Sequence, residues 1–373
     1  MKHKHHIIRV QHLVPDSRKG FPDQELNDRV RLLFENPNNF IWLEHTNDVS
    51  GHAVDAWIDW CGVRNYKNIG LFLNLGVKRP PDSQWERFPI VFCDNNIQSQ
   101  AFYHKVNEQK YNTEITAQNK KILFLTGKPL STNRLPVLDL LDKSELKFTA
   151  SLFWNNNMDM KHATGVCDLS ENRILELVNK YQGSPDHAQV TNGESNIGAF
   201  HMAGVPYDHS IYQTHQLSLV PETKVKWDWE YNFCTEKTFR TIFNHHPFII
   251  LSQPGTLKHL KDRGYDCFQE FLPYPEYDQL DISTPQKLRE NWPHIEKNCQ
   301  ALLDSDPVLV FKKCQSNYQN LVQENEQILE SAHRATEHQI DYGAYSYDAF
   351  YWGVQPDNWV WPSWNTERRK FKK

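Results

Sequence analysis

Two series of short apolar runs, each alternating with amphipathic helical segments, limit the fold of this chain more than any other feature. The first series comprises residues 7–14, 40–44, 69–73 and 89–93, and the second comprises residues 121–127, 146–152, 217–220 and 247–251. Runs of this length are typical of buried strands, and strands that alternate with helices favour parallel sheets covered on both faces. The sequence therefore predicts an α/β protein.

A polar stretch without periodicity, residues 108–120, separates the two series. We interpret it as a linker between two Rossmann-like lobes, the first at residues 1–118 and the second at residues 119–305. Residues 306–373 are predicted to form a helical segment followed by an aromatic, Trp-rich and basic tail. A chain of 373 residues is long enough for two or three domains of ordinary size.

Composition excludes several classes of protein. The chain has 41 Lys and Arg against 46 Asp and Glu, a net charge of −5, so it is not a uniformly basic nucleic-acid coat, although a local basic patch is compatible with this balance. Its apolar runs are far shorter than the roughly 20 residues of a membrane helix, which predicts no membrane insertion. The seven cysteines are scattered without a CxxC pair and favour reduced, buried thiols. We therefore expect a cytoplasmic protein.

Residues 233–264 carry the strongest chemical signal. Thr235 can cap a short amphipathic helix whose first turn holds Glu236 and Lys237. The amides of a helix N-terminus attract anions, whereas a cation there costs roughly a few tenths of a kcal/mol unless an anion accompanies it. The pattern therefore indicates an anion-binding place. The same residues also fit an ordinary capped helix with solvated charges, which is the more common case.

Several motifs together resemble a known enzyme family. They are SLVPET at 218–223, TEKTFRTI at 235–242, HPFIIL at 246–251 and PGTLKHLKDRGYDCFQEF at 254–271. Their order is similar to the donor-binding part of fucosyltransferase-like glycosyltransferases of the GT-B fold, a family with viral and bacterial relatives. KILFLTGKPLSTNRLPVLDLL at 121–141 resembles the strand, basic turn and arginine-containing helix start of the same lobe. The resemblance covers roughly residues 120–275, is poor over 155–215 and hardly reaches the first lobe.

The resemblance implies a metal-independent transfer from a nucleoside diphosphate sugar, which is a donor substrate, without a cofactor. Glu236 matches the glutamate that accepts hydrogen bonds from ribose, and Lys237, beside the cap Thr235, matches the lysine that faces the diphosphate. Arg134 matches a phosphate-binding arginine, whose fork can hold two oxygens. The turn before it is less basic than in the family, so Lys128 is expected to share this role. These cations would stabilise the departing nucleoside diphosphate.

The general base that deprotonates the acceptor hydroxyl is expected in the first lobe. Glu44, His45, Asp55 and Asp94 are the candidates at the ends of its predicted strands. We select Asp94 and Glu44, because Asp94 follows the apolar run 89–93 at the carboxyl end of a strand, where α/β sheets place ligands. Each of these side chains also fits a helix cap or a surface charge.

Two motifs that suggest metal binding have better explanations. The histidine pair at 245–246 has no third ligand at a known spacing. The sequence DSD at 304–306 spells the DxD motif of metal-dependent glycosyltransferases of another fold, but it precedes Pro307 and is predicted as a helix end. We therefore predict no metal site.

The acceptor is left open between a glycan or other small hydroxyl compound and a hydroxymethylated pyrimidine in viral DNA. Both ends of the chain are locally basic, and residues 351–373 combine four tryptophans with the basic end RRKFKK. Such segments can bind phosphates and bases, but they equally fit a tail that docks its tryptophans into a lobe. A viral chain would act in the host cytoplasm. The alternative function is a non-catalytic module that binds a nucleotide sugar or a nucleic acid.

Overall fold

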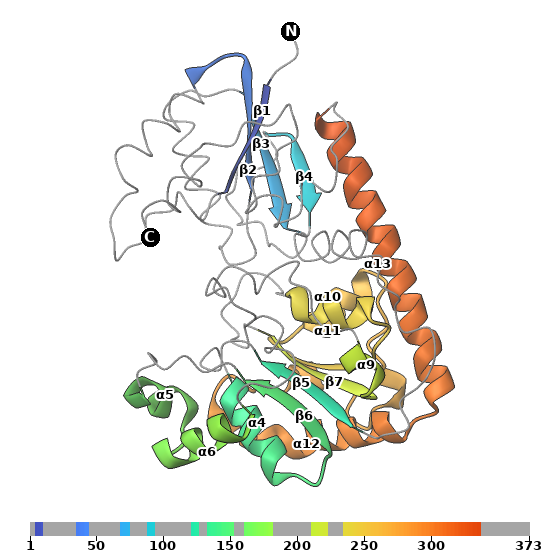
Figure 1. Ribbon diagram of the computed structural model, residues 1–373. Helices are drawn as coiled ribbons and strands as arrows, with labels where there is room; N and C mark the ends of the chain where they lie inside the picture. Colours follow the sequence, from blue (N-terminus) through green and yellow to red (C-terminus); the bar gives the residue numbers. More distant parts are fainter. Residues whose placement is uncertain are drawn as a thin grey trace. The chain divides into compact units, whose positions relative to one another are not determined.

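The computed structural model describes residues 4–9, 35–44, 68–74, 88–93, 121–126, 133–152, 160–181, 210–222 and 234–336. The chain divides into two compact units, Met1–Phe102 with Glu324–Lys373, and Tyr103–Gln323. Residues 306–323 thus belong to the second unit and residues 324–373 to the first, whereas the sequence predicts one separate segment over 306–373. The boundary at residues 323 and 324 falls within the 30-residue helix α13 (Pro307–Thr336), which is labelled in Figure 1.

The first unit contains a four-stranded parallel sheet in the order β1-β2-β3-β4. Its strands are β1 (Lys4–Arg9), β2 (Asn39–Glu44), β3 (Ile69–Asn74) and β4 (Ile90–Cys93). The last three coincide with predicted runs, and β1 lies nearer the start of the chain than the predicted run 7–14. Because all pairs are parallel, the carboxyl ends of the four strands share one edge of the sheet.

Gly70 of β3 makes room for the indole ring of Trp42 in β2. The two residues are partners in the ladder, and Trp42 is only 1% exposed. A Cβ atom at Gly70 would lie 2.4 Å from Cζ3 of Trp42 and 3.0 Å from Cε1 of Phe40. Side chains in a packed core leave no space for such an approach. The pairing of β2 with β3 therefore requires glycine at this position.

The second unit contains another parallel sheet, in the order β6-β5-β7-β8. Its strands are β5 (Ile122–Thr126), β6 (Phe148–Leu152), β7 (Leu217–Pro221) and β8 (Phe248–Leu251). All residues of β7 and β8 are buried, as are four of the five residues of β5. Continuous burial is the pattern of a parallel sheet covered on both faces, which the apolar runs predict. The α/β class with parallel sheets is thus confirmed.

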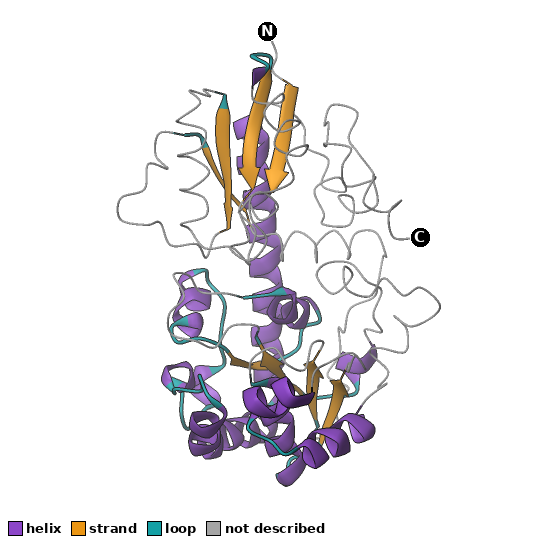
Figure 2. Cartoon of the chain, turned by 90° about the vertical axis from the view of Figure 1, so that its left-hand side faces the viewer, coloured by secondary structure: helices purple, strands orange, loops and turns teal. Residues whose placement is uncertain are grey.

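Helices cover both faces of this second sheet. They are α4 (Arg134–Lys143), α5 (Met160–Cys167), α6 (Glu171–Tyr181), α9 (Ser210–Gln213), α10 (Glu236–Phe243), α11 (Thr256–Asp262) and α12 (Pro285–Asp304), with 3-10 turns η3 (Gln269–Phe271) and η4 (Tyr277–Gln279). Figures 1 and 2 show α10 and α11 on one side of the sheet and α4 with α12 on the other. Accordingly, α12 packs against both α4 and β7.

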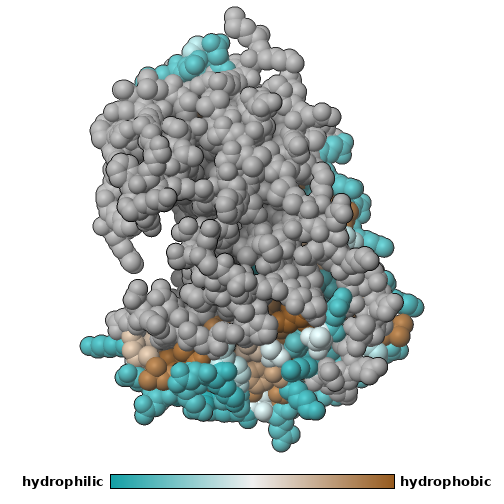
Figure 3. All heavy atoms as spheres, viewed as in Figure 1, coloured by the Kyte–Doolittle hydropathy of each residue, from teal (hydrophilic) through white to brown (hydrophobic). Residues whose placement is uncertain are grey.

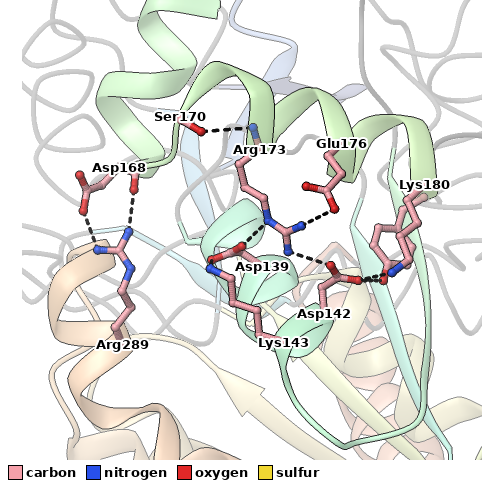
Figure 4. A network of polar contacts seen from close by, with 10 residues as sticks. Asp139, Asp142, Lys143, Asp168, Ser170, Arg173, Glu176, Lys180 and Arg289 are labelled. Carbon is pink, nitrogen blue, oxygen red and sulfur yellow. Dashed lines mark hydrogen bonds and ion pairs between the residues drawn. The ribbon is translucent and has the colours of Figure 1, made fainter.

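A network of charges joins α4 to α6 (Figure 4). The guanidinium of Arg173 donates to Asp139 Oδ1 and to Asp142 Oδ2, each at 2.7 Å. Lys180 and Tyr181 also donate to Asp142. Although burial alone would raise it, these hydrogen bonds lower the pKa of Asp142 to about 2. The network fixes α6 on α4.

Apolar surface on the described part of the chain is scattered. Its exposed large apolar side chains are Leu175, Val308 and Leu309, and Figure 3 shows several small separate apolar groups among hydrophilic side chains on the face drawn. None of the helices in the described ranges is both long enough and apolar enough to cross a membrane. The cysteines at 167, 234, 267, 299 and 314 are buried free thiols, as the scattered spacing predicts.

Candidate functional site

The strand order of the second sheet places a switch point between β5 and β7. From β5 the chain crosses to β6 on one side, and from β7 it crosses to β8 on the other. In open parallel sheets the connections diverge at such a point, and ligands bind outside the carboxyl ends of the two strands. Helix α4 follows β5 and helix α10 follows β7, so both helices begin at this edge. The sequence-predicted site residues of the second lobe belong to these two connections.

A small pocket of about 30 Å³ lies between β5, β7, α9 and α10, beside the switch point. Leucines of both strands, including Leu125 and Leu219, form an apolar floor, and Tyr212 of α9 lines one wall. Lys237 and Arg240 of α10 supply two cations. Residues three apart on a helix share one face, which explains why both line the same pocket. Sequence reasoning missed Arg240, although its spacing from Lys237 was a usable signal.

Helix α10 begins as the sequence predicts. Thr235 is its N-cap, and the hydroxyl oxygen of Thr235 accepts from the backbone N–H of Lys237 at 3.3 Å. The inner face of the helix buries Phe239, Ile242 and Phe243, so packing rather than intrinsic propensity stabilises these two turns. The ammonium Nζ of Lys237 lies 3.2 Å from the same hydroxyl oxygen and is directed back toward the helix start.

The anion at the start of α10 is a residue of the chain itself. Glu222 directly follows β7 and is fully buried. Its Oε1 accepts from the backbone N–H of Thr235 at 2.8 Å and from the Thr238 hydroxyl at 2.5 Å, and its Oε2 accepts from the Thr235 hydroxyl at 2.6 Å. The sequence indicates either an anion-binding helix start or an ordinary capped helix. The backbone N–H of Thr235 is not open to a ligand anion, because Glu222 already accepts from it. The sequence signal for this internal anion was a carboxylate directly after a buried strand.

Arg134 is the first residue of α4 and is only 3% exposed. The side-chain amide of the preceding residue, Asn133, donates to the backbone carbonyl of Ile282. This hydrogen bond fixes the start of α4 against a distant part of the chain. The sequence therefore identified the helix start correctly. The buried guanidinium lies at the start of the helix that follows β5. Lys128, expected to share its role, lies outside the described residues.

The remaining predicted site residues have limited description. Glu236 begins α10 and Glu44 ends β2, but the side chains of both lie outside the described part of the chain. Asp94, the residue after β4, also lies outside it, as do His45 and Asp55. Their proposed roles as ribose acceptor or general base stay predictions.

The Pro-Gly turn before α11 is occupied by an internal carboxylate as well. Gly255 adopts the left-handed conformation with φ of 85°. Oδ2 of Asp278 accepts from the backbone N–H groups of Gly255 and Leu257 at 3.0 and 3.1 Å. Burial raises the pKa of Asp278, although these hydrogen bonds act against the shift. The start of α11 is therefore stabilised from within the chain.

The two motifs that suggest metal binding have structural roles. His246 is buried, where its Nδ1 pairs with the Ser218 hydroxyl at 2.8 Å and its Nε2 with the His215 carbonyl at 2.8 Å, whereas the ring of His245 packs against that of Tyr318. The DSD sequence forms the turn between α12 and α13, as predicted. Within the ranges that the structure describes, no group of three His, Cys, Asp or Glu side chains is arranged to hold a metal ion.

Comparisons with known proteins add no relative. No family model matches this sequence, and no curated protein or solved structure matches it either. The likeness of its motifs to fucosyltransferase-like enzymes therefore stays a resemblance, and the roles that it implies are proposals. What the geometry provides is a pocket with two cations at the switch point of a parallel sheet.

Proposed function

We propose that this chain is a glycosyltransferase that transfers a sugar from a nucleoside diphosphate sugar to a hydroxyl acceptor. In this proposal the chain has two Rossmann-like lobes of the GT-B type, the second unit binds the donor and the first unit binds the acceptor. One observation carries the proposal: Lys237 of the TEK motif lines a pocket beside the switch point between β5 and β7. Such a place is where α/β sheets bind nucleotides.

The chemistry of the pocket supports a diphosphate ligand. Lys237 and Arg240 carry two positive charges next to an apolar floor, and a diphosphate carries at least two negative charges. When the bond between the sugar and the diphosphate breaks, negative charge develops on the leaving oxygen. Cations held in place stabilise that charge more than they stabilise the intact donor, which lowers the barrier.

The acceptor hydroxyl loses its proton to a base as its oxygen attacks the anomeric carbon. Glu44 and Asp94 keep this proposed role, because Glu44 is the last residue of β2 and Asp94 follows β4 in the sequence. The acceptor is a glycan or small hydroxyl compound, or a hydroxymethylated pyrimidine in DNA.

Donor hydrolysis tests the enzymatic part of the proposal. Purified protein is incubated with a panel of nucleoside diphosphate sugars in EDTA, and release of the nucleoside diphosphate is measured. We expect slow release from one donor, because water can replace the acceptor. Turnover that is lost in EDTA and restored by manganese or magnesium would contradict the metal-independent mechanism. Tight binding without any release would favour the non-catalytic binding module.

A further inference from the structure

We infer that Glu222 is a positioning residue that directs the ammonium of Lys237 through the hydroxyl of Thr235. Glu222 itself is fully buried. The inference rests on the proposed function in one respect only: the ligand that Lys237 binds is taken to be a nucleoside diphosphate. The arrangement of the three side chains is observed directly in the second unit.

The direction of each hydrogen bond follows from donor counting. A threonine hydroxyl has one hydrogen and two acceptor lone pairs. Thr235 donates that hydrogen to Oε2 of Glu222 at 2.6 Å, since an ionised carboxylate only accepts. Both lone pairs of the Thr235 oxygen are then directed to Lys237, whose backbone N–H lies at 3.3 Å and whose Nζ lies at 3.2 Å. The carboxylate thus polarises the hydroxyl toward the lysine.

The second oxygen of Glu222 prevents an alternative arrangement. Oε1 accepts from the backbone N–H of Thr235 and also from the hydroxyl of Thr238. Because the backbone N–H cannot reverse its direction, Oε2 is the oxygen that remains for the Thr235 hydroxyl. Lys237 is therefore held toward the helix start, where it lines the pocket beside the switch point.

An isosteric amide at position 222 would reverse the direction of the hydrogen bond between this side chain and the Thr235 hydroxyl. In Glu222→Gln the oxygen stays opposite the Thr235 backbone N–H, and the amide nitrogen then donates to the Thr235 oxygen. One lone pair of the Thr235 oxygen is lost to the amide and the hydroxyl hydrogen must point elsewhere, so the Lys237 ammonium loses this one acceptor. Thr235→Val removes the same acceptor directly. Thr238→Val is the matched control, because Thr238 also donates to Glu222 but has no hydrogen bond to Lys237 among those of the described side chains.

Two readouts on the full chain test the inference. ADP, CDP, GDP and UDP are titrated by calorimetry, and the ligand that binds the wild type is used for the variants. We expect about tenfold weaker binding in Glu222→Gln and Thr235→Val, the size of one lost hydrogen bond to a charged group, and less than about twofold change in Thr238→Val. Thr235→Ser keeps the hydroxyl and should therefore bind the nucleotide as the wild type does. In a Lys237→Ala background the effect of Thr235→Val on binding should disappear, because the ammonium that Thr235 positions is then absent.

The second readout needs no nucleotide and so separates this inference from the proposed function. The rate at which acetic anhydride modifies Lys237 is measured by mass spectrometry at fixed pH. We expect faster modification in Glu222→Gln and Thr235→Val than in the wild type and Thr238→Val, while urea unfolding reports the shared loss of stability. Equal modification rates in all four proteins, or an unchanged effect of Thr235→Val without Lys237, would overturn the inference. A wild type that binds no nucleotide but retains the rate difference would contradict the proposed function alone.

Discussion

Individual side chains at the start of α10 have two tasks that the sequence alone does not separate. Thr235 caps the helix and also links Glu222 to Lys237. The negative charge of Glu222 satisfies the preference of the helix start for an anion. Lys237 is thereby held where it lines the pocket together with Arg240. The TEK motif is therefore hydrogen-bonded to the glutamate of SLVPET, thirteen residues before Thr235.

Buried histidines make the second unit sensitive to acid. Burial lowers the pKa of His246 to about 4, against the hydrogen bond to the His215 carbonyl, and burial with the nearby Arg263 lowers the pKa of His259 to about 4. The pKa of His215 is lowered as well, chiefly by burial. Between about pH 6.5 and pH 4 the unfolded chain binds more protons than the folded chain, so stability is full above pH 6.5 and is lost as the pH falls through this window.

We expect the urea midpoint to fall between pH 7 and pH 4.5, and to fall further below about pH 4, because the lowered pKa of Asp142, about 2, makes protonation of that carboxylate destabilising there. For His246 alone the loss is on the order of 3 kcal/mol when the pH reaches its folded-state pKa. His246→Gln should be less stable at pH 7, because it disturbs the pairing with Ser218, but its stability should depend less on pH. An identical pH dependence in both proteins would refute the assignment to His246.

At the scale of elements, the pairing of β2 with β3 depends on one missing side chain. Gly70→Ala places a methyl group against the buried ring of Trp42 and should cost about 1–3 kcal/mol of stability, the usual cost of overpacking a core. Chemical denaturation measures this change. Adding Trp42→Leu to Gly70→Ala should recover part of the loss, because the smaller side chain frees the space. A Gly70→Ala protein as stable as the wild type would show that the ring can move aside.

Local pattern predicts most elements of the second unit. The predicted run 121–127 contains β5, and the predicted run 247–251 contains β8. Thr235 is the N-cap of α10, the helix that the sequence predicts directly after this threonine. Strand order, by contrast, depends on pairing between distant segments, such as β5 with β7, in which Ile122 pairs with Leu217. No periodicity encodes such a contact.

The candidate site was predictable in part for the same reason. Arg134 and Lys237 follow from motifs near strand ends, and the structure places them in the first turns of the helices after β5 and β7, but of these two only Lys237 is among the residues that line the pocket. The hydrogen bonds from Thr235 and Thr238 to Glu222 join two segments that no local pattern links, whereas the spacing of Lys237 and Arg240 was a usable signal.

At the scale of the whole molecule, charge bears on the acceptor. The net charge of −5 opposes general binding to DNA, while the basic residues 366–373, outside the described part, would favour a local contact. If DNA is the acceptor, affinity for duplex DNA should fall steeply between low and moderate salt, because each neutralised phosphate releases counterions. Removing residues 366–373 should flatten this dependence in a gel-shift series. Absence of binding at low salt would leave glycans and small hydroxyl compounds as acceptors.

The central claim is that a nucleoside diphosphate binds at Lys237, beside the switch point of the second sheet. Calorimetric titration of ADP, CDP, GDP and UDP in EDTA tests it, with wild type, Lys237→Ala and the control Lys258→Ala, whose lysine is exposed on α11 and pairs with Asp262. We predict that one nucleotide binds the wild type and Lys258→Ala equally. Lys237→Ala should bind it roughly ten- to a hundredfold more weakly, the cost of a lost hydrogen bond to a charged group. Unchanged affinity in Lys237→Ala, or no binding to the wild type, would contradict the claim.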